Sequence, residues 1–266
     1  MSRGERPLLR LILALLLLAP AAWADPIPVQ HVQGSARGFL IIKDEQGHRL
    51  GYGDLVQVVH GSRVQSRLTF HFRDGSVDDE ETIYTQRRRF ALVSDHHIQK
   101  GPSFPKPIDV LVNAAGKTVT SRWVDKDGKE KVETQQLEMP PDVSNGMALI
   151  LIGNISPTAE TTTLTYVAST ESKSRLVHLL IHPGGREPLL VAGSHRYAEH
   201  FVIHIELGGV TGMVAPLIGK QPQDVHVWIY PGTVPVVLAE QGQLYQGGPI
   251  WRIELTSPTW LPQAAH

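Results

Sequence analysis

Histidine is the residue type in this sequence that most readily suggests chemistry, since thirteen histidines occur in 266 residues. His200 and His204 would share one face of a strand, but four residues of strand span about 13 Å. A zinc ion reaches each ligating nitrogen at about 2.0–2.1 Å, so this pair alone does not hold a metal. A metal site therefore needs ligands from neighbouring strands. The candidate metal ligands are His200, His204, Glu206 and His226.

A second group of candidates begins at Asp95-His96-His97, which is followed by the polar, proline-containing loop 99–105. Ser103 lies in Gly-Pro-Ser-Phe-Pro, which lacks the second glycine of the hydrolase nucleophile motif, and no helix follows it. We interpret this loop as the rim of a barrel and assign no catalytic residue. Aromatic residues of the last third extend the candidate ligand-binding set. That set is His96, His97, Ser103, Phe104, Trp228, Tyr230 and Trp251.

A phosphate-binding loop is excluded at residues 209–224, GVTGMVAPLIGKQPQD. The motif needs a glycine five positions before Gly219-Lys220 and a serine or threonine directly after the lysine. Val214 and Gln221 occupy those positions, so magnesium would lack its hydroxyl ligand. We expect a loop between two late strands here, and no cofactor is predicted.

The N-terminal residues predict export. Arg3, Arg6 and Arg10 precede or flank the apolar run 11–18, and Ala22-Trp-Ala24 supplies small residues before a cleavage site. This is the pattern of a secretory signal peptide, residues 1–24. The apolar run is shorter than the roughly 20 residues that cross a bilayer. The mature chain, residues 25–266, is therefore expected to be secreted or periplasmic, and not membrane-spanning after cleavage.

Composition excludes several classes of protein. The chain has 25 basic and 26 acidic residues, so it lacks the basic surface that nucleic-acid binding requires. The acidic run 78–81 and the basic run 87–89 are interpreted as solvated faces paired across a hairpin. Because there is no cysteine, the fold must rest on a core, without disulfides, and no cysteine can carry a lipid.

Alternating apolar residues predict a mostly β protein. Val64, Leu68, Phe70 and Phe72 share one face of a strand, and Phe201 to Leu207 repeat the pattern. Turn residues between such runs favour a meander that forms a curled antiparallel sheet or barrel. An outer-membrane barrel is the competing architecture, but aromatic residues make up only 6% of the chain, too few for aromatic girdles.

One segment is predicted to be helical. Pro140-Pro-Asp142 precedes residues 143–152, which favour about three turns of helix with Asp142 as N-cap. A buried strand is the alternative, because Gly146 weakens a helix. We therefore expect a single β-rich domain over residues 25–266 with one short helix. Two β halves that meet near 140–154 are the alternative organisation of this domain.

The chain resembles a group of uncharacterised bacterial secreted or periplasmic β-rich proteins. The resemblance rests on Gly53-Asp54, on Phe72-Arg-Asp-Gly-Ser76 with Glu81-Thr82, and on the loop 99–105. It continues through Pro140-Pro-Asp142 with Asn145-Gly146, 215–222 and Trp251-Arg-Ile-Glu254. It implies an exported, β-rich, single-domain protein and carries over no catalytic residue.

Three functions remain open at this point. The leading hypothesis is a cell-envelope protein that binds a lipid-like or other apolar or amphipathic small molecule in a barrel, because late strands such as 175–181 are apolar on both faces. A barrel interior filled by its own side chains would argue against it. The alternatives are a structural or interaction module without a small ligand, and an envelope enzyme with a histidine/carboxylate site. The sequence leaves the oligomeric state open.

Overall fold

A computed structural model of the chain describes residues 26–170, 173–208 and 221–256. Its elements are β1 (Ala36–Lys43), β2 (Arg49–His60), β3 (Arg63–Phe72), β4 (Val77–Gln86), β5 (Phe90–Lys100), β6 (Ile108–Asn113), β7 (Thr118–Val124), β8 (Glu130–Gln136), α2 (Ala148–Ile152), β9 (Thr162–Ser169), β10 (Ser174–Val191), β11 (Ser194–Glu206), β12 (Val225–Tyr230), β13 (Val236–Gln243) and β14 (Ile250–Leu255). The signal-peptide prediction and most of the loop 209–224 lie outside the described residues. Within them, no helix is long and apolar enough to cross a membrane.

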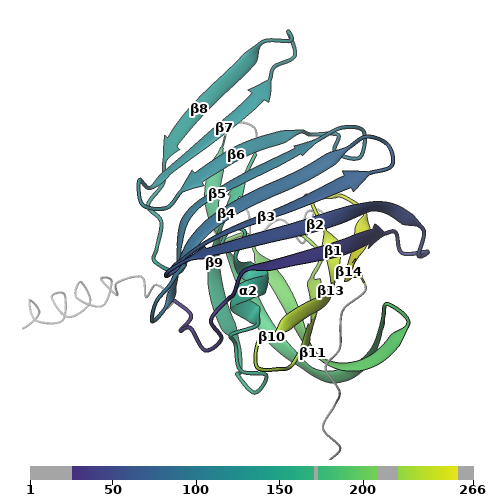
Figure 1. The fold of residues 1–266 in the computed structure, drawn as a ribbon. Coiled ribbons are helices and arrows are strands. Elements are labelled where there is room, and N and C mark those ends of the chain that lie inside the picture. Colours follow the sequence, from purple (N-terminus) through teal and green to yellow (C-terminus); the bar gives the residue numbers. More distant parts are fainter. Residues whose placement is uncertain (1–25, 171–172, 209–220, 257–266) are drawn as a thin grey trace, which may run out of the picture.

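All the described strands belong to one antiparallel sheet, in the order β8-β7-β6-β5-β4-β3-β2-β1-β14-β13-β12-β11-β10-β9. Neighbours in the sheet are also neighbours in the chain, except that β1 pairs with β14. The sheet curls without closing, because β8 and β9 form its two edges (Figure 1). The predicted fold class, a mostly β protein with a curled antiparallel sheet and one short helix, is confirmed.

The chain between β8 and β9, residues 137–161, runs from one edge of the sheet to the other, and we refer to it as the crossing segment. It carries α2 and lies on the concave side of the sheet (Figure 1). Its apolar side chains are buried against residues of both β halves, which therefore share one core. Burying one such side chain contributes about 1.5–3 kcal/mol. The buried ones are Met139, Val143, Met147, Leu151, Ile152 and Ile155.

The helix is shorter than predicted, and the assignment of Asp142 as its N-cap is wrong. α2 spans five residues and begins after Met147, which makes no side-chain capping hydrogen bond. Asp142 accepts hydrogen bonds from the backbone N–H and the hydroxyl of Thr165 instead. Gly146 has a φ of +65°, which ends any regular helix between Asp142 and Met147.

Side chains of the crossing segment cover the free edge of β9. The amide of Asn145 bonds both backbone groups of Val167, at 2.8 and 2.9 Å. Ser144 donates from its N–H and its hydroxyl to the carbonyl of Thr165. These side chains satisfy the backbone groups that another strand would otherwise pair, so the edge is buried without a strand beside it.

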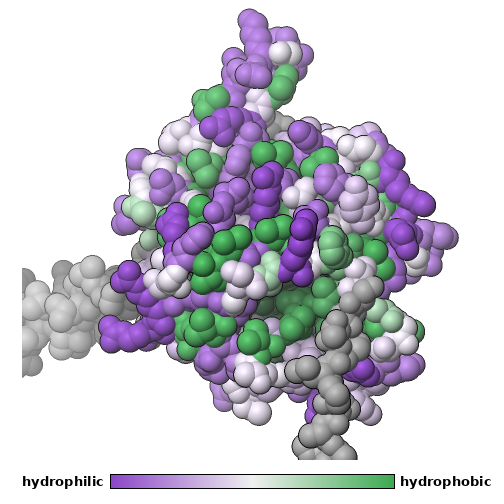
Figure 2. All heavy atoms as spheres, viewed as in Figure 1, coloured by the Kyte–Doolittle hydropathy of each residue, from purple (hydrophilic) through white to green (hydrophobic). Residues whose placement is uncertain are grey.

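The long β10–β11 hairpin extends beyond its neighbours and bends outside the sheet (Figure 1). Its pairing register shifts between Pro183 and Gly185. Beyond the bend, Leu189 and Val191 are buried against Trp228 and Leu238. A groove between the hairpin tip and the β1–β14 pair is lined by Ile41, Lys43, Leu190, Ala192, Gly193, Glu254, Leu255 and Thr256. On this face, hydrophobic residues gather around the hollow between β1 and the hairpin (Figure 2).

The alternation predicted from the sequence agrees with the burial of the strands. In β3, Val64, Phe70 and Phe72 are buried and Leu68 is partly buried. In β11, Phe201 and Ile203 are buried, and Val202 between them is more exposed. In β12, Val227 and Ile229 are buried in the main core, and Trp228 between them is buried on the opposite face, beneath the β10–β11 hairpin.

Candidate functional site

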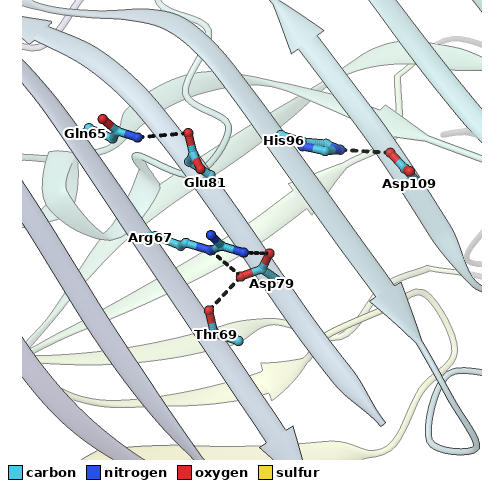
Figure 3. Close-up of polar contacts among 7 residues, drawn as sticks. All are labelled: Gln65, Arg67, Thr69, Asp79, Glu81, His96 and Asp109. Carbon is cyan, nitrogen blue, oxygen red and sulfur yellow. Dashed lines mark hydrogen bonds and ion pairs between the residues drawn. The ribbon is translucent and has the colours of Figure 1, made fainter.

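Strand β4 carries acidic side chains on both faces of the sheet. On the outer face, Arg67 and Thr69 donate hydrogen bonds to Asp79, and Gln65 donates to Glu81 (Figure 3). Asp78 and Glu80 alternate with these residues and therefore face the interior. The expectation that the whole run 78–81 is solvated is thus wrong for Asp78, of which 6% is exposed.

Strand β5 supplies the second part of the interior site. Its register with β4 shifts at Ile83/Tyr84, where Tyr84 pairs with Leu92 and Ile83 with Ser94. The extra residue resets the alternation, so that apolar Leu92 and polar Asp95 are both buried. His97 and Gln99 follow Asp95 on the same face. The bulge therefore separates an apolar half of the strand from a polar half.

Hydrogen bonds connect the interior side chains of β4 and β5. The Nε2 atom of His97 lies 2.7 Å from Oδ1 of Asp78, whose other oxygen accepts from Gln99 at 2.9 Å. Gln99 also donates to the carbonyl of Leu244, 3.0 Å away. The hydroxyl of Thr82 donates to Asp95 at 2.9 Å. Asp78 and Asp95 are thus held in fixed positions.

Glu80, Glu240 and Tyr166 have a different environment. No hydrogen bond or ion pair joins their side chains to any residue that the structure describes. All three are partly buried, and this burial is the largest influence on the pKa of each. Each nevertheless keeps some accessible surface.

The surroundings of these polar groups are apolar. Phe70 lies opposite Asp78 in the β3–β4 pair, and Glu240 lies between Ile253 and Val227 on the neighbouring strands. Phe70 and Ile253 belong to an aromatic-rich cluster, whereas Val227 belongs to the main core. The interior site therefore has acidic groups at its centre and apolar side chains on both sides.

Burial shifts the pKa of the interior carboxyls upward. It raises the pKa of Asp95 to about 8, with a further contribution from the charge of Glu80. It raises the pKa of Glu240 to about 7, with Asp78 adding to the shift. The pKa of Glu80 is raised in the same direction by burial, and His97 opposes the shift. At neutral pH the site therefore holds protons that exposed carboxyls would have lost.

The pKa of His97 is also raised, to about 9. Burial alone would lower it, but the hydrogen bond to Asp78 and the charges of Asp78, Glu80 and Asp95 outweigh burial. His97 is therefore an imidazolium paired with Asp78 at neutral pH. Tyr166 comes from β9, and the nearby carboxylates add to the burial that raises the pKa of its phenol.

The predicted ligand-binding residues lie in several places. His97 is in the interior site, whereas His96 is on the outer face beside Asp109, at 2.9 Å (Figure 3). Phe104 and Trp251 are buried in the aromatic-rich cluster, with ring centroids 5.9 Å apart. Ser103 donates to Asp74 at the surface, at 2.7 Å. Trp228 and Tyr230 pack beneath the β10–β11 hairpin.

The four predicted metal ligands do not come together. His200 and His226 are within hydrogen-bond distance, at 3.0 Å, and the His200 ring stacks on Trp228. His204 bonds Asp224 at 2.7 Å, and Glu206 is exposed. Within the described ranges, no three histidine, aspartate or glutamate side chains form a group that could hold a metal ion.

Sequence reasoning did not identify Asp78, Glu80, Tyr166 or Glu240 as site residues. The available signal was the period-two series Asp78, Glu80, Thr82 and Tyr84, whose last member is typical of a buried face. Glu240 and Tyr166 come from distant strands, and only the curvature of the sheet brings them to the same interior. No local pattern marks them.

The fold and this interior define a barrel-like, open β sheet with an acidic site inside it. No protein-family model matches the chain, and no curated protein matches it. Two solved bacterial structures are similar. A β-barrel-like protein of the domain of unknown function DUF1849 from Brucella abortus has 11% identity and a TM-score of 0.46, over 85% of this chain and 97% of that one. The hypothetical lipoprotein YmcC from Escherichia coli K12 has 11% identity and a TM-score of 0.41, over 97% and 100%.

Proposed function

We propose that the protein is an exported binding protein of the cell envelope that holds a small amphipathic molecule inside its curled sheet. The N-terminal sequence supports export, because residues 1–24 have the pattern of a signal peptide. The mature protein then acts in the periplasm or outside the cell. The ligand lies between the polar interior of β4 and β5 and the apolar side chains on either side.

One observation carries the proposal: the partly buried side chains of Glu80, Glu240 and Tyr166 lie near the interior carboxyls and have no hydrogen-bond partner in the described chain. Perturbed titratable groups of this kind concentrate at functional sites. A ligand with hydrogen-bonding groups would pair with side chains that the protein itself leaves without a partner.

The core limits the size of the ligand. The crossing segment fills the interior at one end of the site, and Phe72, Phe104 and Trp251 fill the interior on the other side. By the criterion given in the sequence analysis, these filled parts of the interior argue against a long lipid chain, and the proposal is limited to a short amphipathic molecule.

Native mass spectrometry of the mature chain, residues 25–266, tests this proposal. The protein would be purified from a bacterial periplasm and measured before and after organic extraction, with metal analysis alongside. We expect an additional small mass that extraction removes. A bare polypeptide mass, together with no ligand-induced change in tryptophan fluorescence across a small-molecule library, would contradict the proposal.

A second candidate function, an interaction module, is favoured by the β8 edge of the sheet. The crossing segment covers the edge of β9, but β8 pairs only with β7 among the described strands. Six of its seven residues are exposed. A strand from another protein could pair with this edge through backbone hydrogen bonds. Thr134→Pro would remove a backbone donor from β8, and abolition of a pull-down partner by this variant would favour the second candidate.

A further inference from the structure

We propose that the free edge of β8 pairs with β8 of a second copy of this chain, antiparallel, around a two-fold axis at Val132. This inference rests on the second candidate function, for which it names a partner, and it is independent of the interior ligand. Three observations carry it: an open stretch of β8, the direction of its backbone groups, and the order of its charges.

The open stretch of β8 is residues 130–134, all of which are exposed. The side-chain amide of Gln135 bonds both backbone groups of Ser174, at 3.0 Å each, and this ties the end of β8 to the start of β10. Before that point, β8 pairs only with β7 among the described strands. The β7–β8 hairpin also reaches beyond the rest of the sheet (Figure 1). A strand of another molecule can therefore approach residues 130–134.

Hydrogen bonds at the two ends of the β7–β8 pair determine which backbone groups of β8 point outward. The N–H of Asp125 donates to the carbonyl of Lys129, and the N–H of Leu137 donates to the carbonyl of Lys117, both at 2.9 Å. Bonded and non-bonded residues alternate along an antiparallel pair. The odd-numbered residues of β8 therefore bond β7, and the even-numbered residues point their N–H and C=O groups to the free side. Those residues are Glu130, Val132 and Thr134.

This alternation limits how a second β8 can pair. Outward-pointing residues must lie opposite outward-pointing residues, so an even-numbered residue always faces an even-numbered one. When Val132 lies opposite Val132 of the second copy, Lys131 lies opposite Glu133 on both sides of the axis. These two pairs occupy non-hydrogen-bonded positions, where opposed side chains are closest. The strand is thus complementary to itself in charge.

The neighbouring registers are unfavourable. A shift of the second copy by two residues in one direction places Lys131 opposite Lys131, and a shift in the other direction places Glu133 opposite Glu133. Like charges directly opposite each other destabilise a pair of strands. Charged residues usually protect an edge strand from pairing. Here their order opposes the shifted registers and favours the one in which Val132, which is 63% exposed, is covered by its own copy.

Lys131 is available for this contact. Its Nζ atom lies 3.4 Å from Oδ2 of Asp125 in the same hairpin, and 48% of the lysine side chain is exposed. An exposed ion pair of this kind contributes little to stability. Lys131 can therefore contact Glu133 of a second copy without weakening the fold of its own chain.

Analytical ultracentrifugation of the mature chain, residues 25–266, tests the inference over a range of protein concentrations at neutral pH. We expect a reversible dimer whose fraction rises with concentration. Lys131→Glu should weaken the dimer about tenfold or more, because it turns two attractive pairs into repulsive ones. Lys126→Glu is the matched control. It makes the same change of charge at an exposed position in the turn, outside residues 130–134, and should leave the dimer unchanged.

A charge exchange separates pairing between copies from a role within one chain. The double variant Lys131→Glu/Glu133→Lys keeps the net charge and again places opposite charges across the axis. Its dimer should be within about threefold of the unsubstituted chain in affinity, since each pair is attractive again. A residue that acted only inside its own hairpin would show no such restoration.

A single introduced cysteine reports the register directly, because the chain has no cysteine of its own. Val132→Cys places the two thiols opposite each other, in a pair whose Cα atoms are about 5.5 Å apart, a distance that a disulfide spans. Thr134→Cys is the control on the same face of β8. Thr134 lies opposite Glu130 of the second copy, so its two thiols are about 13 Å apart along the strand. Mild oxidation should give a covalent dimer of Val132→Cys only.

The outcomes separate this inference from both candidate functions. A chain that stays monomeric at every concentration would overturn it, and the pull-down with Thr134→Pro then judges the second candidate function on its own. A dimer that Lys131→Glu leaves intact would place the contact on another surface and overturn it as well. Equal cross-linking of Val132→Cys and Thr134→Cys would overturn the register. The native mass measurement of a bound small molecule is affected by none of these results.

Discussion

Gly146 in the crossing segment lies directly against Asp95 in β5. A Cβ atom on Gly146 would be 2.4 Å from Oδ1 of Asp95 and 1.8 Å from the hydroxyl oxygen of Thr82. The backbone φ of Gly146 is +65°, a conformation that other residues rarely adopt. The absence of a side chain here therefore lets the crossing segment close over the Thr82–Asp95 hydrogen bond.

Gly146→Ala should destabilise the protein by about 2–4 kcal/mol, because the positive φ and the overlap with Thr82 and Asp95 both oppose the new methyl group. Urea unfolding of the mature chain would measure the change. Gly128→Ala is the matched control. Gly128 also has a positive φ, +76°, but a Cβ there would meet nothing within 4 Å. That variant should lose only about 1 kcal/mol. Equal losses in the two variants would contradict the close contact.

Asn145→Ala should destabilise the protein by about 1–3 kcal/mol. The substitution removes the amide that bonds the backbone N–H and carbonyl of Val167, and it leaves both groups unpaired in a buried place. Thermal or urea unfolding measures the loss. Ser156→Ala is the control, because Ser156 is exposed and its hydroxyl contacts only Thr158. Faster hydrogen exchange at Val167 in Asn145→Ala would identify β9 as the strand affected.

The alternation of residues was sufficient to predict the fold class but not the position of the crossing segment. In strands such as β3 and β11, the residues that face the core can be recognised from the sequence, because apolar residues recur at every second position. The pairing of β1 with β14 joins the two ends of the described chain, and no local pattern specifies it. The course of residues 137–161 follows from that pairing. The sequence therefore predicts a helix cap at Asp142, whereas its carboxylate accepts a hydrogen bond from the backbone of Thr165 in β9.

The interior site was hidden for a similar reason. The run 78–81 was interpreted as solvated because four consecutive acidic residues rarely face a core. The alternation of a strand predicts that two of these four residues face the interior. It does not predict that carboxyl groups are buried there. His97 was identified as a candidate from its neighbours, and its partner Asp78 was not. The bulge in β5 that aligns Asp95 with His97 has no sequence signal.

Two adjacent aspartates of β4 should differ in their importance for stability. Asp78→Asn should cost about 1.5–3 kcal/mol at about pH 7, because it weakens a charge-assisted hydrogen bond to His97 in the interior. Asp79→Asn should cost about 0–1 kcal/mol, since its partner Arg67 is largely exposed and water screens the pair. Chemical unfolding of both variants in one buffer makes the comparison. A larger loss for Asp79→Asn would contradict the assignment of the two faces.

The stability of the protein should depend on the ionisation of Asp95. The pKa of this carboxyl is about 8 in the folded protein, whereas an aspartate of an unfolded chain titrates at about 3.9. The folded state therefore binds the proton more tightly. The contribution of the protonated carboxyl is fully present below about pH 4, and it is lost as the pH rises towards 8.

Asp95→Asn should remove this dependence, since an amide cannot ionise and can still accept the hydrogen bond from Thr82. Relative to the unsubstituted protein, the variant should become more stable as the pH rises from about 5 to 8, by at most about 1.4 kcal/mol per pH unit. Urea unfolding at several pH values measures the difference. His97 titrates in the same direction, between about 6.5 and 9, and it contributes to the pH dependence of both proteins. The difference between them therefore reports the ionisation of Asp95 together with its effect on His97. A difference that stays constant across this range would mean that Asp95 is already ionised in the folded protein at about pH 5.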